Sequence, residues 1–172
     1  QVVEVPVVVT AVAHDHPVSF TQDVLPALTK AGCNQGACHG SQFGQGNFKL
    51  SLLGYAPEQD HPAIVREGNQ RRVALVSPTD SLLLQKAIAA IPHGGGRRMV
   101  TTSAEYQTLK RWIETGAPVP LKDGRKIVDI AVTPNEREYQ ANQTQQLRVV
   151  ATYSDGSQRD VTHHARYDSL SK

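Results

Sequence analysis

Two cysteines and a histidine form a compact group whose residue types and spacing could do chemistry. The segment over residues 33–39 is Cys-Asn-Gln-Gly-Ala-Cys-His, so four residues separate the thiols and the imidazole directly follows the second one. Two such thiols can add across the two vinyl groups of a haem, and the adjacent histidine can bind the iron; the usual spacing is C-x-x-C-H. The segment therefore indicates covalent haem attachment through Cys33, Cys38 and His39.

The longer spacer leaves other interpretations open. Gly36 lets the backbone bulge outward while the two sulfur atoms keep their separation, and Cys38 and His39 stay adjacent as iron ligation requires. A zinc site would need a fourth ligand beside Cys33, Cys38 and His39. A redox-active dithiol normally has the spacing C-x-x-C. A structural disulfide across so short a loop would constrain little of the unfolded chain.

Three helices are predicted around this group. Thr21 is suited to cap a helix that runs to about residue 31, with Val24, Leu25 and Leu28 on one face. A second helix is expected from about residue 80 to a point before Pro92. For the third helix, Ser103 provides the cap. Tyr106, Leu109, Trp112 and Ile113 form its apolar face, and Gly116 and Pro118 end it.

The region between the first two helices, residues 40–79, is predicted to be a polar loop with a short strand at residues 48–52. His14, His16 and His61 are flanked by Pro or Asp and are expected to face solvent. Two arginine pairs, at positions 71–72 and 97–98, are suited either to haem propionates or, as we expect, to the solvated surface.

The chain ends in a segment that alternates apolar and polar residues. Strands are predicted around residues 128–132 and 147–153, Asp155-Gly156 indicates a turn, and a further strand is expected to begin at Val161. His163 and His164, which follow, are expected to be structural. At 47 residues, this segment (126–172) is shorter than a complete immunoglobulin-like sandwich of ~100 residues. Residues 119–125 are a linker, and the valine-rich residues 1–17 are expected to be an extended arm, held as an added strand.

Several separate motifs resemble the cytochrome c modules of planctomycete proteins. They are Cys-Asn-Gln-Gly-Ala-Cys-His-Gly (33–40), Gly-Asn-Phe-Lys-Leu-Ser-Leu (46–52), Ser-Leu-Leu-Leu (81–84), Pro-His-Gly-Gly-Gly (92–96), and Leu-Lys-Arg-Trp-Ile with Gly-Ala-Pro (109–118). The resemblance implies a mainly α, cytochrome c-like domain with long loops over residues 18–118, carrying haem c at a C-x4-C-H site.

The last segment is similar to the first part of a bacterial immunoglobulin-like (Ig-like) domain of the Big2 type. The motifs are Ala-Thr-Tyr-Ser-Asp-Gly (151–156) and Arg-Asp-Val-Thr (159–162). Large multidomain proteins of the same lineage join these two modules, so we expect the chain to be part of such a protein. Covalent haem attachment in this family implies a location in the periplasm or at the cell surface.

The resemblance also implies a second axial ligand before the last helix. Counted back from Trp112, His93 lies 19 positions away, near the register of the axial ligand in related modules, and Met99 lies 13 positions away. We therefore expect His93 to be the sixth iron ligand, with Met99, the only methionine, or an open site as the alternatives. Bis-histidine ligation implies a lower reduction potential than a His/Met pair.

Composition narrows the function classes. The formal charge is +2, with 18 basic and 16 acidic residues and no basic run, which gives no support to nucleic-acid binding. No segment approaches the ~20 apolar residues of a membrane span. The sequence contains no hydrolytic triad, phosphate loop or nucleotide site, so we expect an electron-transfer protein rather than an enzyme. Its redox partner, another protein or a fused domain, is unknown. The alternative is a structural or interaction module in which haem serves as a sensor or spacer.

Overall fold

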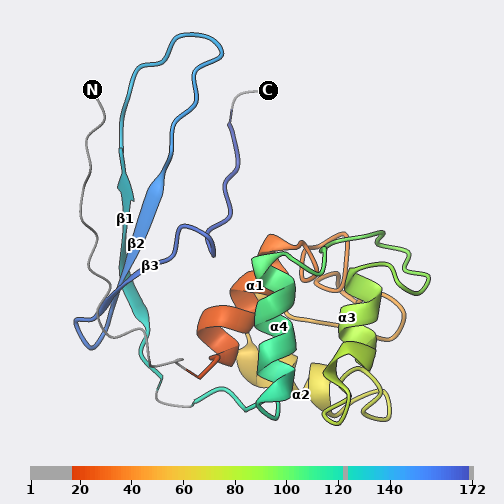
Figure 1. Cartoon of the computed structure of the whole chain (residues 1–172). Helices are drawn as coiled ribbons and strands as arrows, with labels where there is room; N and C mark the ends of the chain where they lie inside the picture. Colours follow the sequence, from red (N-terminus) through yellow and green to blue (C-terminus); the bar gives the residue numbers. More distant parts are fainter. Residues whose placement is uncertain (1–16, 122–123, 171–172) are drawn as a thin grey trace, which may run out of the picture.

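Four α-helices precede a three-stranded antiparallel sheet in the part of the chain that the structure describes, residues 17–121 and 124–170 (Figure 1). The structure is a computed structural model. The helices are α1 (Leu25–Lys30), α2 (Pro57–Val65), α3 (Leu82–Ala87) and α4 (Ala104–Glu114), and the strands are β1 (Ile127–Thr133), β2 (Arg148–Tyr153) and β3 (Gln158–Asp160). This bears out the expected helical part and small β segment. The expected N-terminal arm falls, but for residue 17, outside the described residues.

The first helical segment begins earlier than the sequence indicated. A π-helical turn, Phe20–Val24, leads directly into α1. Its cap is Ser19, whose hydroxyl accepts a hydrogen bond from the Gln22 backbone N–H at 3.2 Å. The Asp23 carboxylate accepts one from the Ser19 N–H at 2.8 Å, so side chains satisfy two backbone N–H groups at the start of this turn. The prediction that Thr21 is the cap was wrong.

Helix α4 has the predicted cap and apolar face. The Ser103 hydroxyl accepts a hydrogen bond from the Tyr106 N–H at 3.3 Å. Gly116, with a φ of +92°, takes the left-handed conformation that ends the helix. The apolar residues of α4 are buried and pack against α1 and α3; they are Tyr106, Leu109, Trp112 and Ile113. In the first helical segment, the predicted face of Val24, Leu25 and Leu28 is likewise buried.

Helix α2 lies within residues 40–79, where the sequence predicted only loop and a short strand. Residues 48–52 form no strand in the described structure, apart from an isolated bridge between Gln45 and Phe48. His61, expected to face solvent, is buried in α2. Its Nε2 is 2.9 Å from the Ala117 carbonyl oxygen, and its ring meets the Phe20 ring edge-on at 5.2 Å. The described residues do not include His14 and His16, which were also expected to face solvent.

The sheet has the order β1-β2-β3, and both strand pairs are antiparallel. Asp155-Gly156 forms the predicted turn between β2 and β3, with Gly156 at a φ of +79°. The third strand begins at Gln158 and ends before Val161, so the prediction that it begins at Val161 was wrong. The buried side chains of β2 alternate as expected: Val149, Ala151 and Tyr153.

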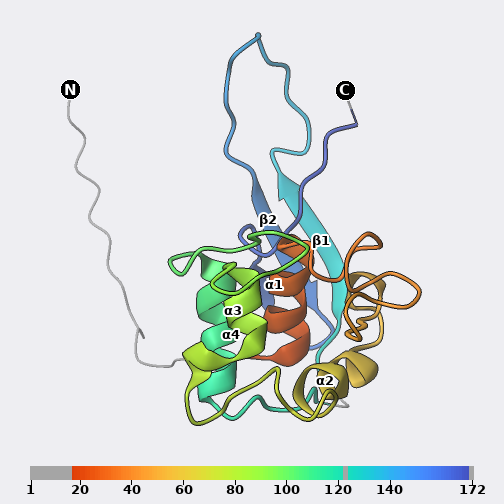
Figure 2. The same ribbon diagram turned by 90° about the vertical axis from the view of Figure 1, so that its right-hand side faces the viewer.

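The sheet is joined to the first helical segment by polar contacts. Asp23 forms an ion pair with Arg159 at 2.7 Å and lies 3.7 Å from Nε2 of His164. The Lys30 ammonium donates to the His163 carbonyl oxygen at 2.6 Å. Figures 1 and 2 place the sheet beside α1, away from α3. No helix among the described residues has the length and apolar character needed to cross a membrane.

Candidate functional site

Cys33 is positioned by the end of α1. The Cys33 N–H donates to the Leu28 carbonyl at 2.9 Å, and the Gly32 N–H donates to the Thr29 carbonyl at 3.0 Å. Gly32 has a φ of +78°, so the helix ends in a Schellman motif with glycine at its left-handed position. This motif fixes the first cysteine against a helix end, rather than leaving it in a free loop.

The four-residue spacer between the cysteines folds into a closed turn, which keeps Cys33, Cys38 and His39 close together. The His39 N–H donates to the Cys33 carbonyl at 3.0 Å, while Gly36 and Ala37 are exposed. This is the outward bulge that the sequence indicated, but the close approach occurs at Gly40. A Cβ there would lie 2.1 Å from the Asn34 carbonyl oxygen, so only glycine fits.

His39 is held in one orientation by the loop that follows. Its Nδ1 is 2.9 Å from the Phe48 carbonyl oxygen, and its ring lies 4.5 Å from the Phe48 ring. Because a carbonyl oxygen can only accept, Nδ1 carries the proton and Nε2 has the lone pair. Burial is the main cause that lowers the pKa of His39, which favours the neutral imidazole that binds metals.

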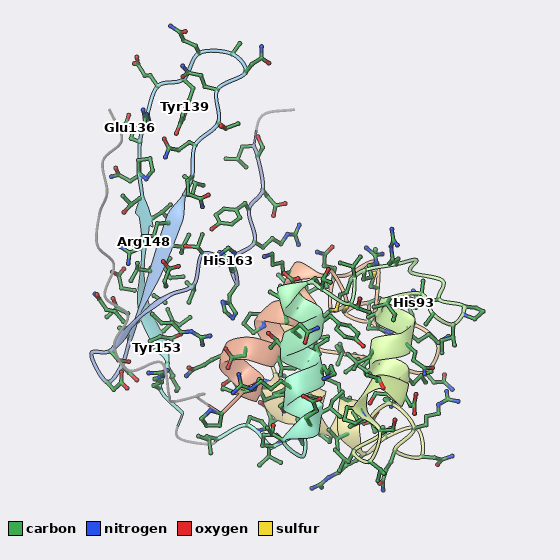
Figure 3. All side chains as sticks on the ribbon, in the orientation of Figure 1. His93, Glu136, Tyr139, Arg148, Tyr153 and His163 are labelled. Carbon is green, nitrogen blue, oxygen red and sulfur yellow. The ribbon has the colours of Figure 1, made fainter. Side chains whose placement is uncertain are left out.

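His93 lies in the loop between α3 and α4 and is held in the same way. Its Nδ1 is 2.8 Å from the Gly96 carbonyl oxygen, so Nδ1 is the donor and Nε2 is the ring nitrogen left to bind a metal. Gly95 passes so close that a Cβ there would lie 3.0 Å from Cε1 of His93 and 3.2 Å from its Nε2. In Figure 3, His93 lies on the side of the helical part that faces away from the sheet.

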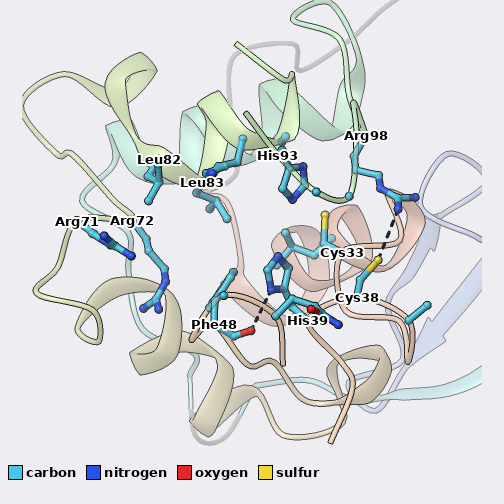
Figure 4. A pocket seen from close by; sticks show the side chains of 18 residues that line it. Cys33, Cys38, His39, Phe48, Arg71, Arg72, Leu82, Leu83, His93 and Arg98 are labelled. Carbon is cyan, nitrogen blue, oxygen red and sulfur yellow. Dashed lines mark hydrogen bonds between the residues drawn. The ribbon is translucent and has the colours of Figure 1, made fainter. Parts of the chain in front are cut away.

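The rings of His39 and His93 both line one cavity. Their planes differ by 9° and their centroids are 6.3 Å apart. Figure 4 shows the two rings reaching into the cavity from opposite sides, with Cys33 and Cys38 beside them. Met99, the alternative ligand, is buried in the hydrophobic core with α1 and α4.

The cavity has a volume of about 650 Å³, within the range of roughly 300–1,000 Å³ that cofactor sites occupy. Its apolar wall includes Leu28, Phe48, Leu82, Leu83 and Ala87. Its cationic residues are Arg71, Arg72, Lys86 and Arg98, and among its described lining residues there is no Asp or Glu. The cavity is therefore suited to a largely apolar ligand that carries negative charge.

The two thiols are free and differ in environment. Burial raises the pKa of the Cys33 thiol to about 11, so this sulfur is protonated at neutral pH. Cys38 lies 3.5 Å from Nη2 of Arg98. A redox-active dithiol needs a thiol whose pKa is lowered, and Cys33 shows the opposite shift.

The arginine pairs divide between surface and cavity. Arg71, Arg97 and Arg98 are exposed as expected, although Arg71 and Arg98 also line the cavity. Arg72 is only 5% exposed, so the expectation of a solvated side chain was wrong for this residue. Gly40 and the carbonyl groups of Phe48 and Gly96 are further parts of the site that were not predicted from the sequence. The Cys-His-Gly motif indicates that Gly40 belongs to the site. No residue pattern in the sequence indicates which backbone carbonyl groups accept hydrogen bonds there.

Among the described residues, no three or more His, Cys, Asp or Glu side chains converge as ligands for one metal ion. Comparison with known proteins adds no relative: no family model, curated protein or solved structure matches this chain.

Proposed function

We propose that this chain is a c-type cytochrome module that transfers electrons through one haem. In this proposal, Cys33 and Cys38 attach the haem through thioether bonds, and His39 and His93 are its two axial ligands. The helical part would then be a cytochrome c-like domain, and the sheet the first part of an Ig-like domain, as the sequence motifs indicate.

The observation that carries the proposal is the spacing of the two imidazole rings. A metal–imidazole nitrogen bond is about 2.0 Å long and that nitrogen lies roughly 1.1 Å from the ring centre, so two ligands on opposite sides of one ion place their ring centres about 6 Å apart. The centroids of His39 and His93 are 6.3 Å apart, and both rings have Nδ1 bonded to a carbonyl oxygen. A backbone partner on Nδ1 is the arrangement that orients histidine ligands toward a metal.

The cysteines fit the same cofactor better than they fit the alternatives. Each thiol can add its S–H across one vinyl group, with the sulfur bonding to one carbon and the hydrogen to the other, and the reaction needs no oxidant. A zinc site lacks a third convergent ligand side chain among the described residues. A redox dithiol is disfavoured by the four-residue spacer, because its usual spacing is C-x-x-C.

When bound, the haem supplies an iron ion that changes between its ferrous and ferric states by one electron. The protein orients both imidazoles through hydrogen bonds from Nδ1 to the carbonyl groups of Phe48 and Gly96. The leucine side chains at the cavity wall would limit the access of water to the haem. Two histidine ligands favour the ferric state more than a His/Met pair does, so we expect a lower potential than that of His/Met cytochromes.

Covalent haem attachment takes place outside the cytoplasmic membrane, so the proposal carries a periplasmic or cell-surface location. The electron donor and acceptor are other proteins or domains fused to this one.

The test is a pyridine haemochrome spectrum of the purified protein after extraction with acidified acetone. We expect haem to stay with the polypeptide and to give the α band of a haem with two thioether bonds. Haem that extracts, or no haem at all, would overturn the proposal. A zinc assay would then test whether the cysteines and His39 bind zinc instead.

A second candidate is an interaction module in which haem is a sensor or spacer. It is favoured by the exposed apolar side chains of β1, namely Val128, Ile130 and Val132. Voltammetry separates the two candidates, because an electron carrier has a reversible couple and fast exchange with small redox mediators. A haem that is inaccessible to mediators would favour the second candidate.

A further inference from the structure

Arg72 is a buried cation that carries no carboxylate partner among the ion pairs of the described residues. Its Nη1 donates to the Ala63 carbonyl at 2.8 Å and its Nη2 to the Asn47 carbonyl at 2.7 Å. Both partners are neutral. Arginine is rarely buried without an acidic partner, because removing its charge from water costs free energy that neutral acceptors only partly offset.

The guanidinium of Arg72 is fixed in place on more than one side. It lies over the Phe48 ring, with Cζ 4.5 Å from the ring centroid. Gly68 approaches it so closely that a Cβ would lie 3.0–3.1 Å from Nη1, Cζ and Nη2. Arginine has five N–H donors, and the two hydrogen bonds described above use two of them. The side chain is therefore held rigid at the cavity wall with donors to spare.

The position of Arg72 in the cavity suggests what those donors bind. Figure 4 shows Arg71 and Arg72 at one side of the cavity, and Cys33, Cys38 and Arg98 at the other. Haem carries its two vinyl groups on one edge of the ring and its two propionates on the opposite edge. Attachment at the cysteines would thus direct the propionates toward the arginine pair.

We propose that Arg72, assisted by Arg71 at the exposed side, is a carboxylate-binding subsite that receives a haem propionate. This inference rests on the proposed function. A rigid guanidinium fork matches a carboxylate in geometry as well as charge. The Glu67 carboxylate acts on Arg72 electrostatically but forms no ion pair with it among the described residues, so a bound propionate would supply a directly paired carboxylate. The other cations of the cavity have different surroundings: Lys86 donates to the Pro92 carbonyl at 2.5 Å, and Arg98 lies beside Cys38.

The subsite is linked to the iron ligand through one residue. Phe48 stacks under the Arg72 guanidinium and gives its carbonyl oxygen to Nδ1 of His39. Arg72 is thus a positioning residue for His39 as well as a ligand for the propionate, and substitutions at Arg72 affect both.

The test uses the wild-type holoprotein in the ferrous state, which is diamagnetic with two histidine ligands. We expect nuclear Overhauser contacts between the methylene protons of one propionate and the side-chain protons of Arg72 and Phe48. Contacts of both propionates with Lys86 or Arg98, and none with Arg72, would overturn the inference while leaving the proposed function intact. A protein without covalent haem would instead overturn the proposed function.

A pair of variants provides a second readout. Arg72→Gln removes the subsite, whereas Arg66→Gln removes the same charge from an exposed position outside the cavity. In resonance Raman spectra of the holoproteins, we expect the propionate bending band to shift for Arg72→Gln and to stay unchanged for Arg66→Gln. Equal bands in wild type and both variants would contradict the subsite. If Arg72→Gln does not fold, the contacts measured on the wild-type protein still decide the question.

Discussion

The imidazole rings of His39 and His93 lie parallel within 9°, with centroids 6.3 Å apart, although 54 positions separate the two residues in the chain. Each ring is held by a hydrogen bond from Nδ1 to a backbone carbonyl, of Phe48 in one case and Gly96 in the other. Two separate loops thus bring two imidazole rings to one cavity. The proposed haem site depends on that pairing.

Replacing His93 by alanine removes one of the two proposed axial ligands. We expect the ferric holoprotein to change from a six-coordinate low-spin spectrum to a mostly high-spin one, and the ferrous form to bind carbon monoxide readily. The matched control is Met99→Leu, a volume-conserving change in the core that should cost less than about 1.5 kcal/mol of stability and leave the spectrum unchanged. If Met99→Leu alters the spectrum and His93→Ala does not, the ligand is Met99.

Replacing either cysteine by alanine leaves one thioether bond. We expect Cys33→Ala and Cys38→Ala each to retain haem, with an α band in pyridine haemochrome that moves to longer wavelength because one vinyl group stays unsaturated. The double variant should lose its haem on extraction with acidified acetone. Unchanged bands in both single variants would mean that these sulfurs are not attached to the cofactor.

Asp60 of α2 anchors the segment that follows His39. Its carboxylate accepts hydrogen bonds from the Ser51 backbone N–H at 2.5 Å and the Ser51 hydroxyl at 2.6 Å. Asp60→Ala leaves the buried N–H without a partner, so we expect a loss of ~1–3 kcal/mol of stability in urea unfolding. Glu58→Ala, at an exposed position of the same helix, should change stability by no more than about 0.5 kcal/mol. Equal effects of the two substitutions would show that the Asp60–Ser51 contact is unimportant.

The environment of Asp60 also gives stability a pH dependence. Burial is the main cause that raises its pKa above the ordinary value of 3.8, although the Ser51 hydrogen bonds act in the opposite direction. The folded state therefore binds this proton more tightly than the unfolded state, so its contribution to stability falls as the pH rises from 3.8 through the folded pKa. We expect the stability of wild type relative to Asp60→Asn to fall across this window. A difference that rises with pH would contradict the direction of the shift.

The elements that the sequence predicted correctly are those whose stabilising contacts are local. Ser103 and Gly116 at the two ends of α4, and Asp155-Gly156 between β2 and β3, carry their own capping and turn chemistry. At the first helix, Ser19 and Thr21 are both good caps, and the Asp23 carboxylate, which accepts from the Ser19 N–H, favours Ser19. That choice depends on a side chain four positions away.

Helix α2 and the deep parts of the site could not be predicted because distant residues decide them. Pro62 lies inside α2, where proline normally ends a helix, and the buried face of α2 includes Asp60 and His61. Their polar groups are satisfied by Ser51 and Ala117, which the local sequence does not indicate. From the sequence, Arg72 resembles Arg71 and is expected at the surface. In the structure, Phe48 and Gly68 enclose its guanidinium group.

An electron paramagnetic resonance spectrum of the ferric protein tests most directly whether His39 and His93 bind one iron. Two histidine ligands with nearly parallel ring planes make the iron environment rhombic, so we predict a low-spin signal with three resolved g values, and a loss of this signal in His93→Ala. A high-spin signal in the wild-type protein, or the absence of any haem iron signal, would contradict the pairing of His39 and His93 on one iron.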